Sequence, residues 1–248
     1  MSNYKRVRLL FIAMLFAGAI IAAAALPHSR QNPASPTDQP EGKKTDAGQE
    51  LRRREHGKLF DGHHGPKLRD LAASQQGEVS VWEEEPYVIR RADDPVSQRP
   101  FMQFAVCNAN AVVIGTLTGE TPQLPPSENF IFTDYEMTVE EAIKPDASAV
   151  PRLDKILVTR QGGTLHQGGR AFRAEVEGFK PFAVGKRYLL FLRYIPTTGA
   201  YLAYANGSFQ LDGNKVIALG KPPKDQSESL TTFLAEAHAA MAHGGCAK

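Results

Sequence analysis

The spacing of apolar residues divides the chain into three stretches. An uncharged run from Leu9 to Leu26 follows a short basic start, and residues 27–75 then contain few large apolar side chains. From Val79 onward, short apolar and alternating runs recur to the end of the chain, as in a domain built of β-strands. We therefore expect an apolar N-terminal helix at 1–26, a linker at 27–75 and a folded domain at 76–248.

The N-terminal run predicts passage through a membrane. Lys5, Arg6 and Arg8 resist translocation, so the chain after the run is expected on the far side. The run is long enough to span a bilayer, and its alanine-rich end at residues 23–25 suits a signal peptidase. Both a cleaved signal peptide and a retained signal anchor, a single transmembrane helix, stay open. The expected location is extracytoplasmic: secreted, periplasmic or on the cell surface.

The linker has two halves of different composition. Residues 27–49 are rich in Pro, Ser, Gln, Asp and Gly, so they bury too little apolar surface to offset the entropy of ordering and are expected to be a disordered tether. Residues 50–75 are expected to be partly helical. Arg52, Arg53 and Arg54 form a basic cluster there, either a solvated face or a contact for anionic lipid or an acidic polymer.

Alternating and apolar runs predict the strands of the domain. Strands are expected near residues 79–82, 111–117, 130–143, 156–159 and 188–194. In the 130–143 strand, Tyr135, Met137 and Val139 share one face, and Asp134, Glu136, Thr138 and Glu140 share the other, which is the period of a half-buried strand. Asn206-Gly207 and Asp212-Gly213 each favour the positive φ of a tight hairpin.

A helix is predicted at the C-terminal end. Leu230, Phe233, Leu234, Ala237 and Met241 recur at helical spacing and form one apolar stripe, which we expect to pack on the sheet. A partner-binding helix is the alternative. Short strands with a closing helix indicate a mainly β fold: an OB-like five-stranded Greek-key barrel first, and a β-sandwich second.

Composition limits the function classes. The formal net charge of +2 argues against nucleic acid as a partner, because that needs a concentrated basic face. The chain contains no G-x-S-x-G, no P-loop, no dinucleotide fingerprint and no C-x-x-C. We therefore expect a protein that is not an enzyme and that needs no cofactor.

One segment carries candidate metal ligands. His56, Asp61, His63 and His64 lie close together in EHGKLFDGHHG, and imidazoles with a carboxylate can bind zinc or copper. The glycines in this segment break any helix that would fix the spacing of the ligands. A flexible polar loop is therefore the alternative interpretation.

Three segments of the domain resemble a known family. CNANAVVIGTLTG, TDYEMTVEEAIKP and FAVGKRYLLFL are similar in order and spacing to the netrin-like module, the OB fold of the tissue inhibitors of metalloproteinases (TIMPs) and of netrin and complement C-terminal domains. The likeness covers about residues 101 to 246. It implies a disulfide between Cys107 and Cys246, which suits an exported chain with two cysteines; two unpaired thiols are the alternative.

The resemblance does not carry the inhibitory mechanism of the family. TIMPs bind the zinc of their target enzyme through an N-terminal cysteine, whereas Cys107 follows a long N-terminal extension and belongs to no Cys-x-Cys. The first hypothesis is therefore a non-enzymatic binding or adaptor module whose ligand is a protein or an envelope polymer. A protease-inhibitor-like protein and a metal-binding or metal-dependent enzyme using His56 to His64 are the alternatives.

Overall fold

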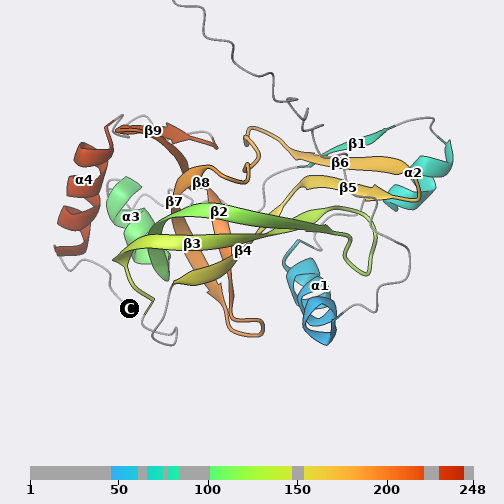
Figure 1. The fold of residues 1–248 in the computed structure, drawn as a ribbon, viewed down its shortest axis with the longest axis horizontal. Helices are drawn as coiled ribbons and strands as arrows, with labels where there is room; N and C mark the ends of the chain where they lie inside the picture. Colours follow the sequence, from blue (N-terminus) through green and yellow to red (C-terminus); the bar gives the residue numbers. More distant parts are fainter. Residues whose placement is uncertain are drawn as a thin grey trace, which may run out of the picture. The chain divides into compact units, whose positions relative to one another are not determined.

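The computed structural model describes residues 46–60, 66–74, 78–83, 101–146, 154–220 and 229–242. All of them belong to the unit Asp38–Lys248. Figure 1 labels their helices and strands. The helices described are α1 (Ala47–Leu59), α2 (Leu68–Ser74), α3 (Phe101–Asn108) and α4 (Leu230–Ala242). The strands described are β1 (Val79–Glu83), β2 (Ala111–Gln123), β3 (Phe132–Lys144), β4 (Lys155–Gln161), β5 (Gly163–Gln167), β6 (Arg170–Val176), β7 (Arg187–Ile195), β8 (Ala200–Asp212) and β9 (Lys215–Ala218).

The larger sheet curls into a partly closed ring. Its strand order is β4-β3-β2-β7-β8-β9, and β4 also pairs with β8. This closing contact is parallel and joins Val158 to Tyr201 and Thr159 to Leu202, whereas the neighbouring pairs β2–β3, β3–β4, β2–β7 and β7–β8 are antiparallel. The expectation of a mainly β domain with a C-terminal helix is confirmed.

The expected hairpin at Asn206-Gly207 is wrong, because β8 runs through these residues without reversing. The pairs Leu190–Ser208 and Leu192–Ala203 show that β8 bends between them while both of its halves stay on β7. The chain therefore has strand partners on both sides of the dipeptide. The second expected hairpin is confirmed, since Gly213 has φ +56° in the turn between β8 and β9.

Alternate residues of the strands build the interior of the ring. Val113, Leu117, Tyr135, Met137 and Leu190 belong to one buried cluster, together with Val158, Tyr188, Leu192, Tyr201 and Ala203. The inward face predicted for Tyr135 and Met137 is therefore confirmed. β-branched and aromatic side chains of this kind suit a curved, closed sheet.

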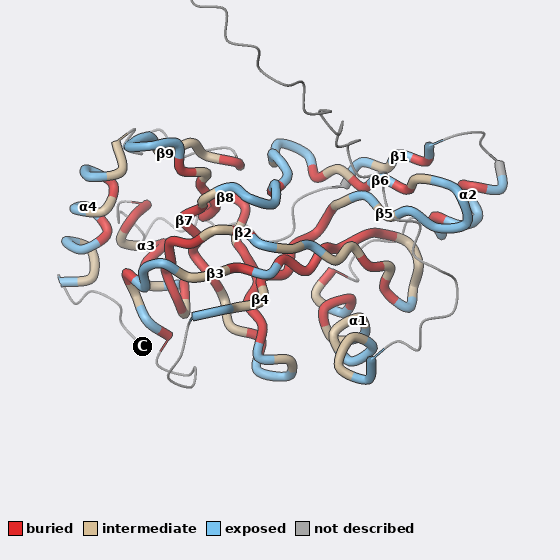
Figure 2. The backbone as a smooth tube through the Cα atoms, viewed as in Figure 1, coloured by how far each residue is buried: buried red, intermediate tan, exposed pale blue. Residues whose placement is uncertain are grey.

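The outward residues of β2 and β7 are covered by two helices. Val112, Ile114, Leu189 and Phe191 pack with α3 and α4. Figure 2 shows the buried parts of both helices in red. The predicted apolar stripe of α4 belongs to or packs against this cluster: Leu230, Phe233, Leu234, Ala237 and Met241. The Phe233 ring lies 4.9 Å from the Phe209 ring. The prediction that the terminal helix packs on the sheet is thus confirmed.

Helix α1 covers another outward face, formed by β3, β4 and β8. Phe60, next to its end, packs with Phe130, Phe132 and Leu202. We expected residues 27–75 to be a linker, partly helical in their second half. However, α1 and α2 bury side chains such as Phe60 and Leu68. The folded unit therefore begins before residue 76, because these helices and the residue after α1 cover apolar side chains on or next to the strands.

A smaller sheet lies beside the ring. Its order is β1-β6-β5, with β1 parallel to β6, and α2 packs on it through Leu68 and Ala72. Ile131, just before β3, belongs to the same buried cluster, which joins this sheet to the ring. The predicted strand at residues 79–82 is confirmed as β1.

Several predictions fall outside the described residues. These are the N-terminal segment at 1–26, the linker up to residue 45, Asp61, His63, His64 and Cys246. In the part of the chain that the structure does describe, every helix is too short or too polar to cross a membrane.

Candidate functional site

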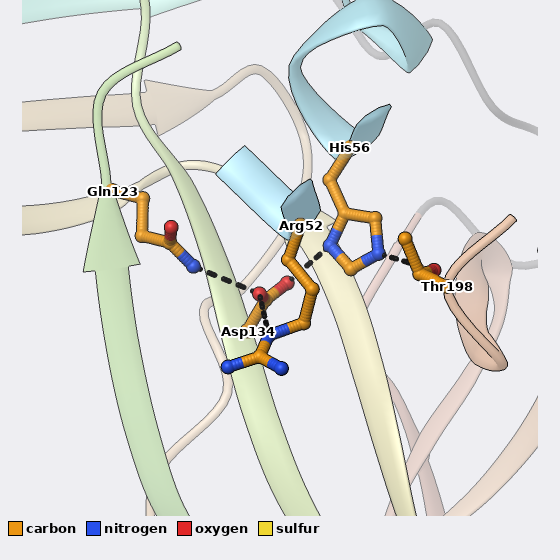
Figure 3. Close-up of polar contacts among 5 residues, drawn as sticks. All are labelled: Arg52, His56, Gln123, Asp134 and Thr198. Atoms are coloured by element: carbon orange, nitrogen blue, oxygen red, sulfur yellow. Dashed lines mark hydrogen bonds and ion pairs between the residues drawn. The ribbon is translucent and has the colours of Figure 1, made fainter. Parts of the chain in front are cut away.

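A buried carboxylate on β3 is the centre of a polar cluster (Figure 3). Asp134 Oδ1 lies 2.8 Å from His56 Nδ1 of α1. The other ring nitrogen, Nε2, lies 2.8 Å from the hydroxyl oxygen of Thr198, in the turn between β7 and β8. An ionised carboxylate only accepts hydrogen bonds, so Nδ1 donates to Asp134, and in a neutral ring Nε2 accepts from Thr198.

The second carboxylate oxygen has its own partners. Gln123 Nε2, at the end of β2, donates to Asp134 Oδ2 at 2.8 Å, and Arg52 Nε of α1 lies 3.9 Å from the same oxygen. Asp134 is 2% exposed and His56 is fully buried. Burying a charge is costly unless partners surround it, and here side chains from other elements satisfy this one.

The order hydroxyl, imidazole, carboxylate is also that of hydrolases with a nucleophilic side chain. Such an enzyme needs donors for an oxyanion and access for its substrate. Here the amides of Thr198 and Gly199 both donate to the Ile195 carbonyl, at 3.2 and 2.9 Å. Because His56 is also completely buried, the cluster is better explained as the contact that docks α1 on the larger sheet.

A cavity of about 630 Å³ lies where the ring meets the smaller sheet. Tyr135 and Arg160 line it from β3 and β4, and Phe179 and Phe182 line it from the connection between β6 and β7. Trp82 of β1 lines it from the smaller sheet and is 71% exposed. The Tyr135 and Phe179 rings lie 5.1 and 5.6 Å from that of Phe182. A cavity with an aromatic lining is a typical place for a ligand.

Arg160 brings a positive charge to this cavity. It lies two residues after Val158 on β4, so its side chain leaves the strand on the same, inward face. It is only 2% exposed. Its Nη1 donates to the Ala203 carbonyl at 3.0 Å, and its Cζ lies 3.6 Å from the centre of the Phe179 ring. Burial lowers the pKa of Arg160 to about 9, so the guanidinium is still cationic at neutral pH.

Other charged residues on the lining add to this positive charge. Among the described lining residues, Arg160, Arg173 and Lys180 are basic and Glu175 is acidic. Arg173 lies 2.6 Å from Glu175, so this pair is neutral as a whole. Lys180, the third basic residue of the described lining, is exposed.

Glycines allow the chain to turn at the edge of the cavity. Gly162 lies between β4 and β5, Gly163 is the first residue of β5, and their φ angles are +94° and +135°. A Cβ at Gly163 would lie 2.1 Å from the Thr133 hydroxyl, which donates to the Gly162 carbonyl at 2.7 Å. The turn directly after Arg160 and Gln161 therefore needs glycine for both its dihedral angles and its space.

The predicted metal ligands are only partly within the described residues. His56 is described, and both of its ring nitrogens contact protein side chains. Asp61, His63 and His64 lie outside the described residues, so the metal site stays a prediction. Within the described part of the chain, no three His, Cys, Asp or Glu side chains come together as a metal would need.

The arginine cluster of α1 has divided roles. Arg53 pairs with Glu50 at 3.1 Å and Arg54 with Glu55 at 3.0 Å, both on the helix itself. Arg52 instead reaches towards the Asp134 carboxylate. The cluster is therefore not one uniform basic face.

Of the two cysteines in the predicted disulfide, Cys107 lies within the described residues and Cys246 does not. Cys107 lies half-buried in the last turn of α3, which packs against α4, and Cys246 comes after α4, outside the described residues. The bond stays a prediction. Counting reactive thiols in the unfolded chain without reductant tests it: none is expected, and two would contradict it.

The sequence did not lead us to predict the central residues of the polar cluster and of the cavity. Asp134 alternates with core residues, so the pattern placed it on the polar face, whereas α1 covers that face and buries it. Arg160 gave a usable signal, since it is a charge at the inward parity of a strand. Thr198 and Trp82 gave none, because their roles depend on segments far away in the chain.

No protein-family model matches this chain, and a search of curated proteins finds no match either.

Proposed function

We propose that this protein is a non-enzymatic extracytoplasmic binding module that holds its ligand in the cavity beside Trp82 and Arg160. The cavity carries this proposal. Its volume of about 630 Å³ lies in the range of small-molecule sites, which also suits one segment of a protein or of an envelope polymer. The lining combines aromatic side chains with a few charged groups, as ligand sites do.

A netrin-like, OB-like barrel is the second part of the proposal. The ring order β2-β3-β4-β8-β7 supports it, with the first three strands consecutive and the last two exchanged. A five-stranded, partly open Greek-key ring of this kind is the OB architecture. The helix after the last strand fits the resemblance of residues 101 to 246.

The extracytoplasmic location is supported by the sequence. Basic residues at positions 5, 6 and 8 precede the apolar run, and this order retains the N-terminus and exports the chain beyond the run. The two cysteines suit an oxidising compartment.

Native mass spectrometry tests the binding function. The full chain, purified from its own cell envelope without denaturant, is expected to carry an additional bound mass. Leu219→Trp, which places an indole ring on the cavity wall, and Thr164→Trp at the cavity edge are both expected to reduce the bound fraction.

Thr197→Trp is the matched control, because it adds the same ring at an exposed turn outside the cavity lining. This variant should keep the bound mass. The proposal fails if the unaltered chain carries no ligand, or if the cavity variants retain it as fully as the control.

A further inference from the structure

We infer that the ligand of this cavity is an uncharged saccharide chain, one sugar ring of which stacks on the indole of Trp82. This inference rests on the proposed function and names the ligand class of the same site. It depends on three observations: an exposed aromatic ring on a sheet face, hydrogen-bonding side chains beside it on that face, and an ion pair that neutralises the charges next to it.

The face of the smaller sheet that is turned away from α2 forms one side of the cavity. Phe172 and Ala174 of β6 belong to the cluster that packs with α2. Because side chains alternate along a strand, Arg173 and Glu175 leave β6 on the opposite face. Trp82 is aligned with Glu175 across β1 and β6, so the indole lies on this face too. The sheet therefore holds an indole and polar side chains in fixed positions next to each other.

The indole of Trp82 offers the ligand a broad apolar surface. It is 71% exposed, whereas Tyr135 and Phe182, which line the same cavity, are 5% and 6% exposed. The two buried rings therefore form part of the floor, and the ring of Trp82 is the one that a ligand can cover. A pyranose ring carries C–H groups on its flat faces, so stacking on an indole removes apolar area of both partners from water.

Polar side chains beside the indole suit the hydroxyl groups at the edge of a sugar ring. Thr164 of β5 is aligned with Arg173 of β6, and both are exposed on the cavity lining. A threonine hydroxyl donates and accepts, a guanidinium donates, and a carboxylate such as Glu175 accepts. The face therefore provides donors and acceptors within reach of one another, as a ring with several hydroxyl groups requires.

The charges on this face balance each other. Arg173 lies 2.6 Å from Glu175, and their side chains are 49% and 29% exposed. A charged ligand would meet a like charge in this pair, whereas neutral hydroxyl groups can bind to both of its members. Lys180, an exposed cation of the described lining, belongs to the connection between β6 and β7 and not to the sheet face. The balance favours an uncharged saccharide over an acidic or basic one.

Fluorescence and calorimetry of the full chain test the ligand class. The probes are tetramers of β-1,4-linked glucose and of β-1,4-linked N-acetylglucosamine, and sorbitol is the matched probe that has hydroxyl groups but no ring. Trp82 is the single tryptophan of the chain, so a change in its emission reports binding at this face. We expect at least one tetramer to shift the emission and to bind about 10-fold more tightly than sorbitol, as ring stacking implies.

Substitution of the indole should weaken tetramer binding in calorimetry. We expect a loss of about 10-fold for Trp82→Ala and a smaller loss for Trp82→Phe, which keeps an aromatic ring. Because Trp82 is mostly exposed, both variants should stay folded. Leu51→Ala is the matched control, since Leu51 is an apolar side chain of α1 that is 39% exposed and lies outside the cavity lining. It should leave the affinity unchanged.

Removing the arginine of the face should have a smaller effect. Arg173→Met deletes the guanidinium donors, and we expect the tetramers to bind about 2- to 10-fold more weakly, as the loss of a hydrogen bond implies. Arg69→Met is the control, because Arg69 also forms an exposed ion pair, with Glu128, outside the cavity lining. This variant should bind the tetramers as the unaltered chain does.

The possible outcomes separate the two proposals. If neither tetramer binds more tightly than sorbitol, or if Trp82→Ala binds the tetramers as well as Leu51→Ala does, the saccharide inference is overturned. It is also overturned if a proline decamer shifts the Trp82 emission and the tetramers do not. In each of these cases the mass carried by the chain from its own envelope decides the binding function: a bound mass keeps that function, and its absence overturns it.

Discussion

The molecule buries two charges in opposite ways. The Asp134 carboxylate is enclosed by partners from α1 and the end of β2, and its partner His56 is held in turn by the turn between β7 and β8. The Arg160 guanidinium is equally buried, but it borders an open cavity. The two residues belong to adjacent aligned pairs of β3 and β4: Asp134 faces Thr159, and Thr133 faces Arg160.

Both charges have partners within the chain, and they differ in what lies next to them. A buried charge that is enclosed by its partners contributes to stability only as long as every partner is present. A buried charge beside a cavity also borders space that another molecule could enter. Burial alone therefore does not identify a binding residue, and the adjoining space must be considered with it.

Removing the charge of the enclosed carboxylate should have the largest effect. Asp134→Asn leaves His56 and Arg52 without their anion, and we expect a loss of about 3–5 kcal/mol in the free energy of unfolding. Urea unfolding measures it. The control is Glu136→Gln, an exposed residue of the same strand, which should change stability by less than about 0.5 kcal/mol. Equal effects of the two variants would show that the cluster does not hold α1.

Overpacking where α1 fits closely against Pro125 should have the next largest effect. A Cβ on Gly57 would lie 2.8 Å from the Pro125 Cβ, so Gly57→Ala should destabilise the protein by about 1–3 kcal/mol through overpacking. Gly48→Ala in the same helix is the matched control, since its new Cβ would have its nearest neighbour at 3.4 Å. This control should be neutral or slightly stabilising, because alanine favours helix. Thermal unfolding compares the two variants, and a destabilised Gly48→Ala would contradict the proposed fit.

The cavity charge should behave differently in the same assay. Arg160→Met keeps a side chain of similar length but removes the hydrogen bond to the Ala203 carbonyl and the stacking of the guanidinium on Phe179. We expect a loss of about 1–3 kcal/mol in the free energy of unfolding, smaller than that of Asp134→Asn and measured by urea unfolding. A loss as large as that of Asp134→Asn would mean that Arg160 is held as a structural charge, and the comparison would no longer stand.

Breaking an exposed ion pair should give the smallest loss in the free energy of unfolding. Burial raises the pKa of Glu140. A hydrogen bond from Thr116 and the Arg187 guanidinium lower it by more, so the pKa lies below the ordinary 4.5. A depressed carboxyl pKa adds stability above pH 4.5, and this contribution is lost as pH falls through the folded pKa. Glu140→Gln should therefore cost less than about 1 kcal/mol at neutral pH, with the difference disappearing in acid when urea unfolding is repeated there.

Local pattern was sufficient to predict most strands of the domain. Alternation assigned Tyr135 and Met137 to the interior, and helical spacing gave the stripe from Leu230 to Met241. Both assignments depend only on neighbours along the chain. They could therefore be made without knowing which strands pair.

The errors arose where a distant segment decided the outcome. Asp134 was assigned to the polar face, but a helix that begins at Ala47 covers it. Asn206-Gly207 has the residues of a tight turn, yet pairing with β7 on both sides keeps β8 continuous. The cavity combines Trp82, Arg160 and Phe179, which no spacing rule connects.

The parallel contact between β4 and β8 has a consequence for how the chain acquires its shape. It joins positions 158 and 201, which are far apart along the chain. The strands β5, β6 and β7 lie between β4 and β8 in the sequence. Pairing between segments so far apart is slow, because a long loop must close first. A chain that is made N-terminus first therefore keeps one edge of β4 unpaired until β8 has been made.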